Sequence, residues 1–417
     1  MDALLTDELR AVLGRAEELA NDLGLQAVRR WKARTGGKAL GYLPIWAPRE
    51  LLEGAGVLAV GIVGGGDAVE IVRGDAYFQS YICQIPRSTI ELGLNGSLDA
   101  LDGMIFPSTC DVIRNLSGMW QLLFPDRYVR YLDLPQNFDP ALGGSFFEGE
   151  LRGLWADLQR LTAKPASEAD LWAAIEAGDR NRRAIADVYA LRAAQPWLVP
   201  TGELFLVLKA GNVLPLDEHT ALLREYERAA RASGRPVEDR ARVAMTGCFC
   251  EQPPLGLITT LERSGCYVVA DDFARAARFL QGDVAPAPGL RRGDPIAALS
   301  RAVLGQSVKC ASMYLESGVK GQALLDEARG VQAEGVIFAA PSFCDPALLD
   351  QPMTQKAVEA AGVPTTAFKY AENNGQFQAI REQTGAFADS IKIWSEVAPA
   401  PRGPIGLPVV NASGACP

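Results

Sequence analysis

Short hydrophobic runs of strand length alternate with stretches of helical periodicity in two separate parts of the chain. In the first part, AVGIV and GMIFP predict buried strands, while CDVIRNLSGMWQLLF and the segment from Gly149 to Leu161 predict helices. Such alternation is typical of βα units that build a parallel sheet. We therefore expect a first α/β domain over residues 39–165.

The same alternation returns over residues 237–395, where we expect a second α/β domain. Four runs predict its strands, namely RVAMTG, CYVVA, GVIFAA and TTAFK. The expected helices begin near Pro254, Gly321, Asp345 and Asn374. The predicted fold class is thus α/β, with two parallel-sheet domains of the flavodoxin-like or Rossmann-like type.

Three further segments complete the expected organisation. Their patterns predict an N-terminal helical segment, a helical connector between the two α/β domains and a poorly ordered tail, at residues 1–38, 166–236 and 396–417.

Composition excludes several classes of protein. Lysine and arginine number 41 against 50 aspartate and glutamate residues, a net charge of −9, which argues against a surface that binds nucleic acid. No apolar run approaches the roughly 18 residues of a membrane-spanning helix. The first residues, MDALLTDELRAVLGRAEELANDLG, predict an acidic amphipathic helix rather than a secretory signal. We expect a cytoplasmic protein that binds neither nucleic acid nor membrane.

The chain lacks the common motifs of histidine-dependent and nucleotide-dependent enzymes. Its one histidine, His219, nearly excludes histidine-based zinc sites and Ser-His or Cys-His nucleophiles. That residue falls on the polar first turn of a predicted helix, where a solvated or capping side chain is expected. The glycines at 64–66 do not match GxGxxG, and GxxxxGK[ST] occurs nowhere. A simple glycine turn is expected at 64–66.

Two segments far apart in the chain carry the same motif. MIFPSTCD at 104–111 and VIFAAPSFCD at 336–345 both predict a buried strand that ends in Pro-Ser-x-Cys-Asp and enters a helix. Ligands of open α/β sheets lie at the carboxyl ends of the strands. A helix N-terminus carries a partial positive charge that favours thiolate. Cys110 and Cys344 are therefore placed where a thiolate ligand is stabilised.

The other cysteines divide into candidates and core residues. Cys83, in FQSYICQIPRSTIELG, precedes a helix expected near Pro86, and Cys248 and Cys250 follow the strand RVAMTG. Soft sulfur ligands favour iron–sulfur clusters or zinc. No CxxC pair is present, however, so spacing alone leaves scattered structural cysteines an equal alternative.

The remaining thiols receive other interpretations. Cys266, inside the strand CYVVA, is expected in the core, and Cys310 and Cys416 are given no role. Cys248 is expected beside a site rather than in it, because alternate side chains of an extended chain point in opposite directions.

Longer strings of the sequence resemble a known family. They are GYLPIWAPRELLEGAGVLAVGIVGGGD, DAYFQSYICQIPRSTIELGL, DGMIFPSTCDVIRNLSGMW, CFCEQPPLGLITTLERSGCYVVADD, EGVIFAAPSFCDPALL and FKYAENNGQFQAIREQTGAFADSIKIWS. Together, from about residue 38 to 395, they resemble the C-type subunits of the ATP-dependent (class I) benzoyl-CoA reductases, within the wider 2-hydroxyacyl-CoA dehydratase family.

The resemblance implies a specific site. Catalytic subunits of this family hold one four-iron four-sulfur (4Fe-4S) cluster between their two α/β domains through three cysteines, which fall on Cys83, Cys110 and Cys344. Cys250 matches a cysteine of the reductase branch and is either an additional ligand or a neighbour of the substrate. Four charged residues flank these loops and are candidates for contact with substrate or a partner, with plain surface charge as the alternative: Arg87, Glu251, Lys369 and Glu372.

The resemblance also implies an activity and partners. Such a subunit pairs with a homologous B-type subunit, and a pair of ATPase subunits drives electrons from ferredoxin into this module. The ring of benzoyl-CoA is reduced to cyclohexa-1,5-diene-1-carbonyl-CoA in anaerobic degradation of aromatic compounds. A 2-hydroxyacyl-CoA dehydratase subunit and a non-catalytic electron-relay subunit remain alternatives, although CFCEQPP and FKYAENNGQ favour the reductase. Which subunit binds the thioester stays open.

Overall fold

The computed structural model describes most of the chain. The described residues are 5–43, 47–163, 165–247, 253–273, 279–287, 289–291, 293–309, 313, 315, 318–371 and 377–395.

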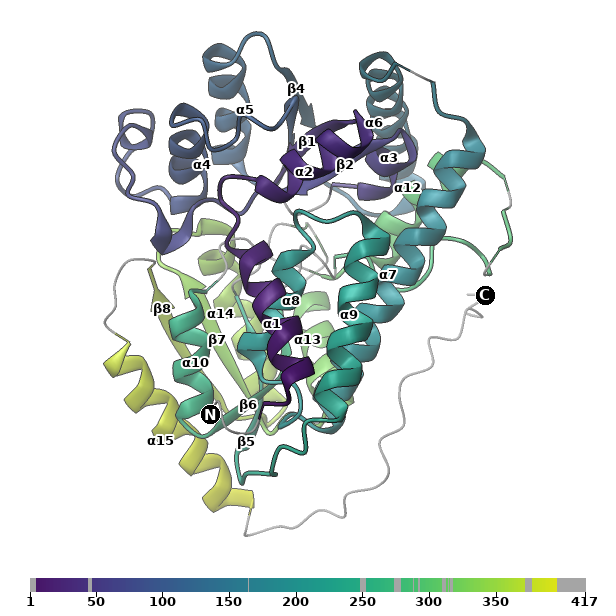
Figure 1. The fold of residues 1–417 in the computed structure, drawn as a ribbon. Coiled ribbons are helices and arrows are strands. Elements are labelled where there is room, and N and C mark those ends of the chain that lie inside the picture. The colour runs from purple at the N-terminus through teal and green to yellow at the C-terminus, as the bar shows by residue number, and fades with distance from the viewer. Residues whose placement is uncertain are drawn as a thin grey trace.

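Two parallel sheets of four strands dominate the protein (Figure 1). The strand order is β2-β1-β3-β4 in the first sheet and β6-β5-β7-β8 in the second, so both have the same topology. In each, the first strand lies between the second and the third, and the chain reverses its direction of winding there. This confirms the predicted fold class, and it makes the carboxyl ends of the strands the expected place for a ligand.

The first sheet is built from the N-terminal part of the chain. Its strands and the helices between them are β1 (Lys38–Tyr42), α3 (Arg49–Gly54), β2 (Val57–Gly61), α4 (Gln84–Leu94), β3 (Gly103–Pro107), α5 (Asp111–Leu123), β4 (Tyr128–Leu132) and α6 (Pro140–Leu161). Two short 3₁₀ helices, η2 (Gly66–Ala68) and η3 (Gly74–Ala76), lie in the long connection after β2. The glycine turn expected at 64–66 is confirmed, since Gly64 and Gly66 have positive φ angles of 77° and 52°.

The second sheet follows the helical connector. The connector consists of α7 (Glu168–Ala194), α8 (Thr201–Ala210) and α9 (Leu216–Arg231). The second sheet and its helices are β5 (Ala241–Thr246), α10 (Leu255–Arg263), β6 (Cys266–Asp271), α12 (Pro295–Gln306), α13 (Val319–Gly330), β7 (Gly335–Pro341), α14 (Asp345–Ala360), β8 (Thr365–Tyr370) and α15 (Gln378–Ser395). At the N-terminus, α1 (Asp7–Ala20) packs on α8 and α9, and α2 (Gln26–Thr35) leads into β1.

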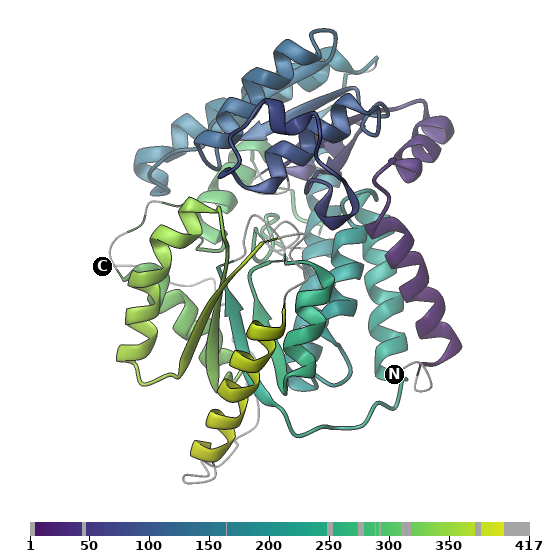
Figure 2. The ribbon, with the colours of Figure 1, turned by 90° about the vertical axis from the view of Figure 1, so that its left-hand side faces the viewer.

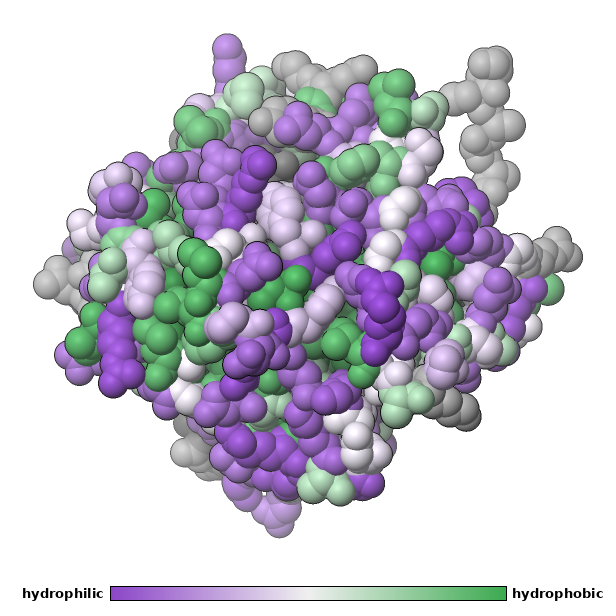
Figure 3. Space-filling model, turned by 90° about the horizontal axis from the view of Figure 1, so that it is seen from above, coloured by the Kyte–Doolittle hydropathy of each residue, from purple (hydrophilic) through white to green (hydrophobic). Residues whose placement is uncertain are grey.

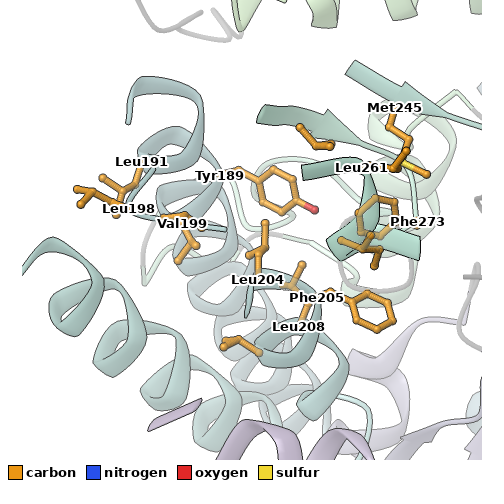
Figure 4. Close-up of a cluster of buried hydrophobic side chains, with 14 of the residues drawn as sticks. Tyr189, Leu191, Leu198, Val199, Leu204, Phe205, Leu208, Met245, Leu261 and Phe273 are labelled. Atoms are coloured by element: carbon orange, nitrogen blue, oxygen red, sulfur yellow. The ribbon is translucent and has the colours of Figure 1, made fainter. Parts of the chain in front are cut away.

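Hydrophobic side chains cover both faces of each sheet. One face of the second sheet packs on the connector helices and α1, where Tyr189, Phe205 and Phe273 lie among aliphatic side chains (Figure 4). Cys266 is 0% exposed in this cluster, which confirms its assignment to the core. The opposite face carries α13 and α14. The two faces of the first sheet form separate clusters.

The boundary between the two α/β units is not simple. The helix α12 lies inside residues 237–395, yet its Leu299 and Val303 belong to the same buried cluster as Leu40 and Leu51 of the first unit. Packing of α12 against α6 accounts for this. Residues 237–395 therefore contribute the helix α12 to the core around the first sheet. The domain boundaries given above stay predictions.

A buried ion network joins the first unit to the connector. Arg182 of α7 pairs with Glu50 of α3 and with Asp179, and all three side chains are largely buried. Asp179 also accepts the backbone N–H groups of Val284 and Ala285, at 2.8 and 3.0 Å. Breaking a buried network of this kind is strongly destabilising because it leaves an uncompensated charge. These contacts hold the first unit to the long helix that also packs on the second sheet.

The prediction that His219 is solvated or caps its helix is wrong. The side chain is 0% exposed, because α7 and α8 cover this turn of α9. Its Nε2 donates to the carbonyl oxygen of Val207, and its Nδ1 accepts from the Asn181 amide, both at 3.1 Å. Burial, and secondarily the nearby Arg49 charge, lowers the pKa of His219 to about 3. The folded protein therefore holds this imidazole uncharged.

The stability of the protein should fall in mild acid because of His219. The unfolded chain binds a proton at this residue with a pKa near 6.5, whereas the folded chain does not until the pH approaches 3. The free energy of unfolding should therefore decrease below pH 6.5 by up to about 1.4 kcal/mol per pH unit. Denaturant titrations at pH 7.5 and 5.5 measure this loss. The His219→Gln variant, which has no histidine left, should lose much less over this range; an equal loss in both proteins would contradict the prediction.

Among the described residues, no helix combines the length and the apolar character needed to span a membrane.

Candidate functional site

A cavity of about 820 Å³ lies between the two α/β units and brings three cysteines together. Cys83 and Cys110 reach it from the first unit and Cys344 from the second, which lies below the first in Figures 1 and 2. The first two thiols are half-buried and the third is buried. The structure thus places on one cavity the three cysteines that the family resemblance marks as cluster ligands. Whether they bind a cluster stays a prediction.

Each of the three cysteines occupies the same local position. Cys83 is the N-cap of α4, Cys110 the N-cap of α5 and Cys344 the N-cap of α14. The backbone N–H groups of a helix's first turn have no partner within the helix and carry partial positive charge. Three helix N-termini therefore face one cavity, and each favours a negatively charged sulfur.

The repeated Pro-Ser-x-Cys-Asp motif has the same structure in both units. It follows the third strand of each sheet, β3 and β7, in equivalent topological positions. The N–H of Ser108 donates to the Leu132 carbonyl at the end of β4, at 2.9 Å, and the N–H of Ser342 donates to the Tyr370 carbonyl at the end of β8, at 2.7 Å. The strand ladder therefore continues past each proline, which fixes the point at which Cys110 and Cys344 begin their helices.

Local charges act on Cys110 in opposite directions. Burial raises the pKa of its thiol, while the N–H groups of Ile113 and Val112 lower it, and the net shift is upward. Asp111 and Asp345 also raise it. Asp345 belongs to α14, and it lines the same cavity as Cys110 and Asp111 at the start of α5. A cation or metal group at this position would offset the burial cost of the thiolate.

The rest of the cavity wall combines apolar and charged side chains. The charged residues that line it are Asp111, Arg114, Asp133, Lys320, Asp345 and Asp350. Lys320 and Asp350 form an ion pair of 2.8 Å, and both also line an adjoining cavity of about 400 Å³. The apolar residues of the wall include Ile82, Ile113, Leu134, Phe138, Met313 and Leu315. This mixture suits a ligand with an apolar body and a few polar groups.

Large hydrophobic side chains are exposed at the mouth of the cavity. Tyr81, Phe343, Leu349 and Met353 line it and are exposed, Leu349 to 76%. Further hydrophobic patches interrupt the hydrophilic surface seen from above (Figure 3). Contiguous exposed apolar residues rimmed by polar ones are typical of a protein–protein contact.

No three or more His, Cys, Asp or Glu side chains in the described part of the chain are arranged to hold a single metal ion. The three cysteines nevertheless line one cavity. Soft sulfur donors of this kind suit zinc or an iron–sulfur cluster.

The other candidate residues are placed as follows. Arg87 pairs with Asp75 at 2.6 Å, and Lys369 is exposed on β8. Neither is among the described residues that line the cavity. The possible ligand Cys250 and the candidates Glu251 and Glu372 lie outside the described residues.

Sequence reasoning missed several residues of the cavity wall. Asp133 follows β4, a strand that the hydrophobic pattern did not predict. The alternation in YVRYL was the available signal. Asp111 and Asp345 stand in the repeated motif itself, whereas Lys320 and Asp350 gave no local signal.

Comparisons with known proteins find relatives that match most of the chain. The family model described as 2-hydroxyglutaryl-CoA dehydratase, D-component, matches residues 44–391. The chain is 49% identical over 386 residues to the C-type subunit of benzoyl-CoA reductase from Thauera aromatica, an alignment that covers 92% of this chain and 99% of that protein. It is 26% identical over 359 residues to the (R)-phenyllactyl-CoA dehydratase beta subunit of Clostridium sporogenes, with 86% and 93% covered. It is 27% identical over 363 residues to the beta subunit of (R)-2-hydroxyglutaryl-CoA dehydratase from Acidaminococcus fermentans, with 87% and 94% covered.

Proposed function

The chain belongs to the family described as 2-hydroxyglutaryl-CoA dehydratase, D-component, and on this premise we propose that it is the iron–sulfur subunit of an ATP-dependent benzoyl-CoA reductase. The enzyme adds two electrons and two protons to the aromatic ring of benzoyl-CoA and forms cyclohexa-1,5-diene-1-carbonyl-CoA. The observation that carries the proposal is the shared cavity of Cys83, Cys110 and Cys344, each at a helix N-terminus.

These three thiolates would hold one 4Fe-4S cluster, since soft sulfur donors suit iron. Such a cluster supplies single electrons at low potential when bound. The helix N-termini stabilise the thiolate form of the cysteines. Ile82, Ile113 and Leu134 make part of the cavity wall apolar, and an apolar wall would limit the access of water to a strongly reducing group.

The chain's degree of similarity favours the reductase over a dehydratase. Its identity to the reductase subunit is 49%, against 26% and 27% for two dehydratase beta subunits. In a 2-hydroxyacyl-CoA dehydratase the same cysteines would serve an electron that is recycled, with no net reduction. That activity is the second candidate, because its family model covers residues 44–391.

The relatives are subunits of larger enzymes, as their names state. The partners in the proposal are a homologous B-type subunit, a pair of ATPase subunits and ferredoxin. We propose that this complex works in anaerobic metabolism. The exposed hydrophobic residues at the mouth of the cavity, such as Phe343 and Leu349, support a subunit contact there.

A comparison of two activities tests the proposal. The complete complex is purified without oxygen and given benzoyl-CoA or a 2-hydroxyacyl-CoA, each with ATP and a low-potential reductant. We expect steady ATP-dependent formation of the cyclic diene, with two electrons used per ring, and no loss of water from the hydroxyacyl substrate. Dehydration without ring reduction would overturn the proposal in favour of the dehydratase.

A further inference from the structure

Cys83 differs from the other two cysteines in what precedes it. Cys110 and Cys344 directly follow buried central strands, β3 and β7, so the sheets hold them. Cys83 instead follows residues 62–82, all of which the structure describes and which contain only turns and the short helices η2 and η3. Some other contact must therefore fix the chain that leads into Cys83.

One carboxylate of α4 receives three backbone hydrogen bonds from this connection. The N–H groups of Val72, Arg73 and Gly74 all donate to Oε2 of Glu91, at 2.9, 2.6 and 2.9 Å. Glu91 is only 6% exposed. Burial raises the pKa of Glu91, but the three N–H groups and the charge of Arg73 together outweigh this effect, so the net shift of the pKa is downward. The side chain is therefore a carboxylate at neutral pH, and hydrogen bonds to a charged acceptor are about twice as strong as neutral ones.

The same connection lies unusually close to the helix. A Cβ atom added at Gly74 would come 2.1 Å from the carbonyl oxygen of Arg87, closer than any real contact allows. Only glycine permits this approach, so the sequence Val72-Arg73-Gly74 is adapted to lie on α4 with its N–H groups toward Glu91.

Arg87, one turn before Glu91 on α4, holds the rest of the connection. It pairs with Asp75 at 2.6 Å and donates to the Ile82 carbonyl at 3.4 Å, next to Cys83. Its side chain is largely buried and does not line the cysteine cavity in the described part of the protein. Between these contacts, Phe78 is buried in the core of the first unit.

We infer that Glu91 is a positioning residue for the cysteine site: its carboxylate fastens residues 72–74 to α4 and so keeps Cys83 facing Cys110 and Cys344. This inference rests on the proposed function for its consequence, the stable binding of a cluster. The positioning itself concerns only this chain's own contacts.

The Glu91→Gln variant tests the inference, because it removes the charge and keeps the shape of the side chain. Glu262→Gln is the matched control: Glu262 also accepts a backbone N–H, from Thr201 at 2.7 Å, but it lies on α10 in the second unit. Anaerobic apoprotein is treated with iodoacetamide, and the rate of modification of each cysteine is followed by peptide mass spectrometry. A second arm reconstitutes the chain with iron and sulfide and measures the rate of iron loss to a chelator.

In Glu91→Gln we expect Cys83 to be modified about tenfold faster. The reason is that the neutral amide accepts weaker hydrogen bonds than the carboxylate, so residues 72–74 should hold Cys83 in place less firmly. Cys110 and Cys344 should keep their rates, and the reconstituted protein should lose iron faster. Glu262→Gln should leave the Cys83 rate unchanged. An unchanged Cys83 rate in Glu91→Gln, or an equal rise at all three cysteines, would overturn the inference. If the unaltered chain takes up no iron and sulfide, the proposed function fails instead, and the modification rates still decide the role of Glu91.

Discussion

Replacing Cys110 with serine should remove most of the bound iron and lower the rate of ring reduction by at least about a hundredfold. This loss should exceed the loss caused by mutating a residue that only orients a metal ligand, because the ligand itself is removed. Cys110 lines the cavity at the N-cap of α5, and serine offers a hard oxygen in place of a soft thiolate. The fold should persist, because the side chain is half-buried and serine is a favourable N-cap residue. Iron analysis, activity of the complex and thermal unfolding measure the three outcomes.

Cys266→Ser is the matched control for this substitution. Cys266 is fully buried in β6, and burial raises its thiol pKa to about 12. A serine hydroxyl without a partner should cost about 1–3 kcal/mol of stability there, with iron content and specific activity retained. Equal iron loss in both variants would show that iron binding reports general instability rather than ligation by Cys110.

The isolated chain should show no ATP-dependent reduction of benzoyl-CoA, and addition of the proposed B-type subunit and ATPase pair should restore this activity. The sequence holds no phosphate-binding loop of the GxxxxGK[ST] type, so coupling to ATP needs other polypeptides. The exposed hydrophobic residues Tyr81, Phe343 and Met353 line the cavity with the cysteines and suit a covering subunit. The measurement is diene formation by the chain alone, by the partners alone and by the full mixture. Steady turnover by the chain alone would contradict this division of labour.

The repeated motif shows what the sequence alone could predict. A buried strand, a strand-ending proline and a helix N-terminus lie within about ten residues in each copy, so local contacts determine the structure. The starts of α5 at Asp111 and α14 at Asp345 were predicted for this reason. The strands β6 and β7 of the second sheet follow the same logic, because each contains a short run of hydrophobic residues, YVVA and VIFAA.

Features that depend on distant contacts could not be predicted from pattern. His219 lies on a polar turn, yet Asn181 and Val207 from two other helices enclose it. The helix α12 packs on α6 across more than a hundred positions of sequence. The hydrophobic pattern did not predict the strand β1. This strand contains Gly41, whose missing side chain leaves room for Met104 and Leu101, so the run of hydrophobic residues in β1 is interrupted.

The spacing of the cysteines in the sequence likewise could not predict that these three cysteines line one cavity. No local motif links Cys83 to Cys344, and only the resemblance to a known family placed them in one site. The contacts of Glu91 gave no signal either, because its partners are backbone N–H groups that any sequence possesses. The topology explains the result: the carboxyl ends of β3 and β7 face the same cavity, and α4 adds the third thiol.

We propose that Cys83, Cys110 and Cys344 together hold one iron–sulfur cluster in the cavity between the two α/β units. Anomalous X-ray scattering at the iron edge, from crystals of the complex grown without oxygen, tests it most directly. We expect one group of four irons in this cavity, with three of the irons each bonded to the sulfur of a different one of these cysteines. A cavity without iron, or a cluster in which any of the three cysteines takes no part, would contradict the account.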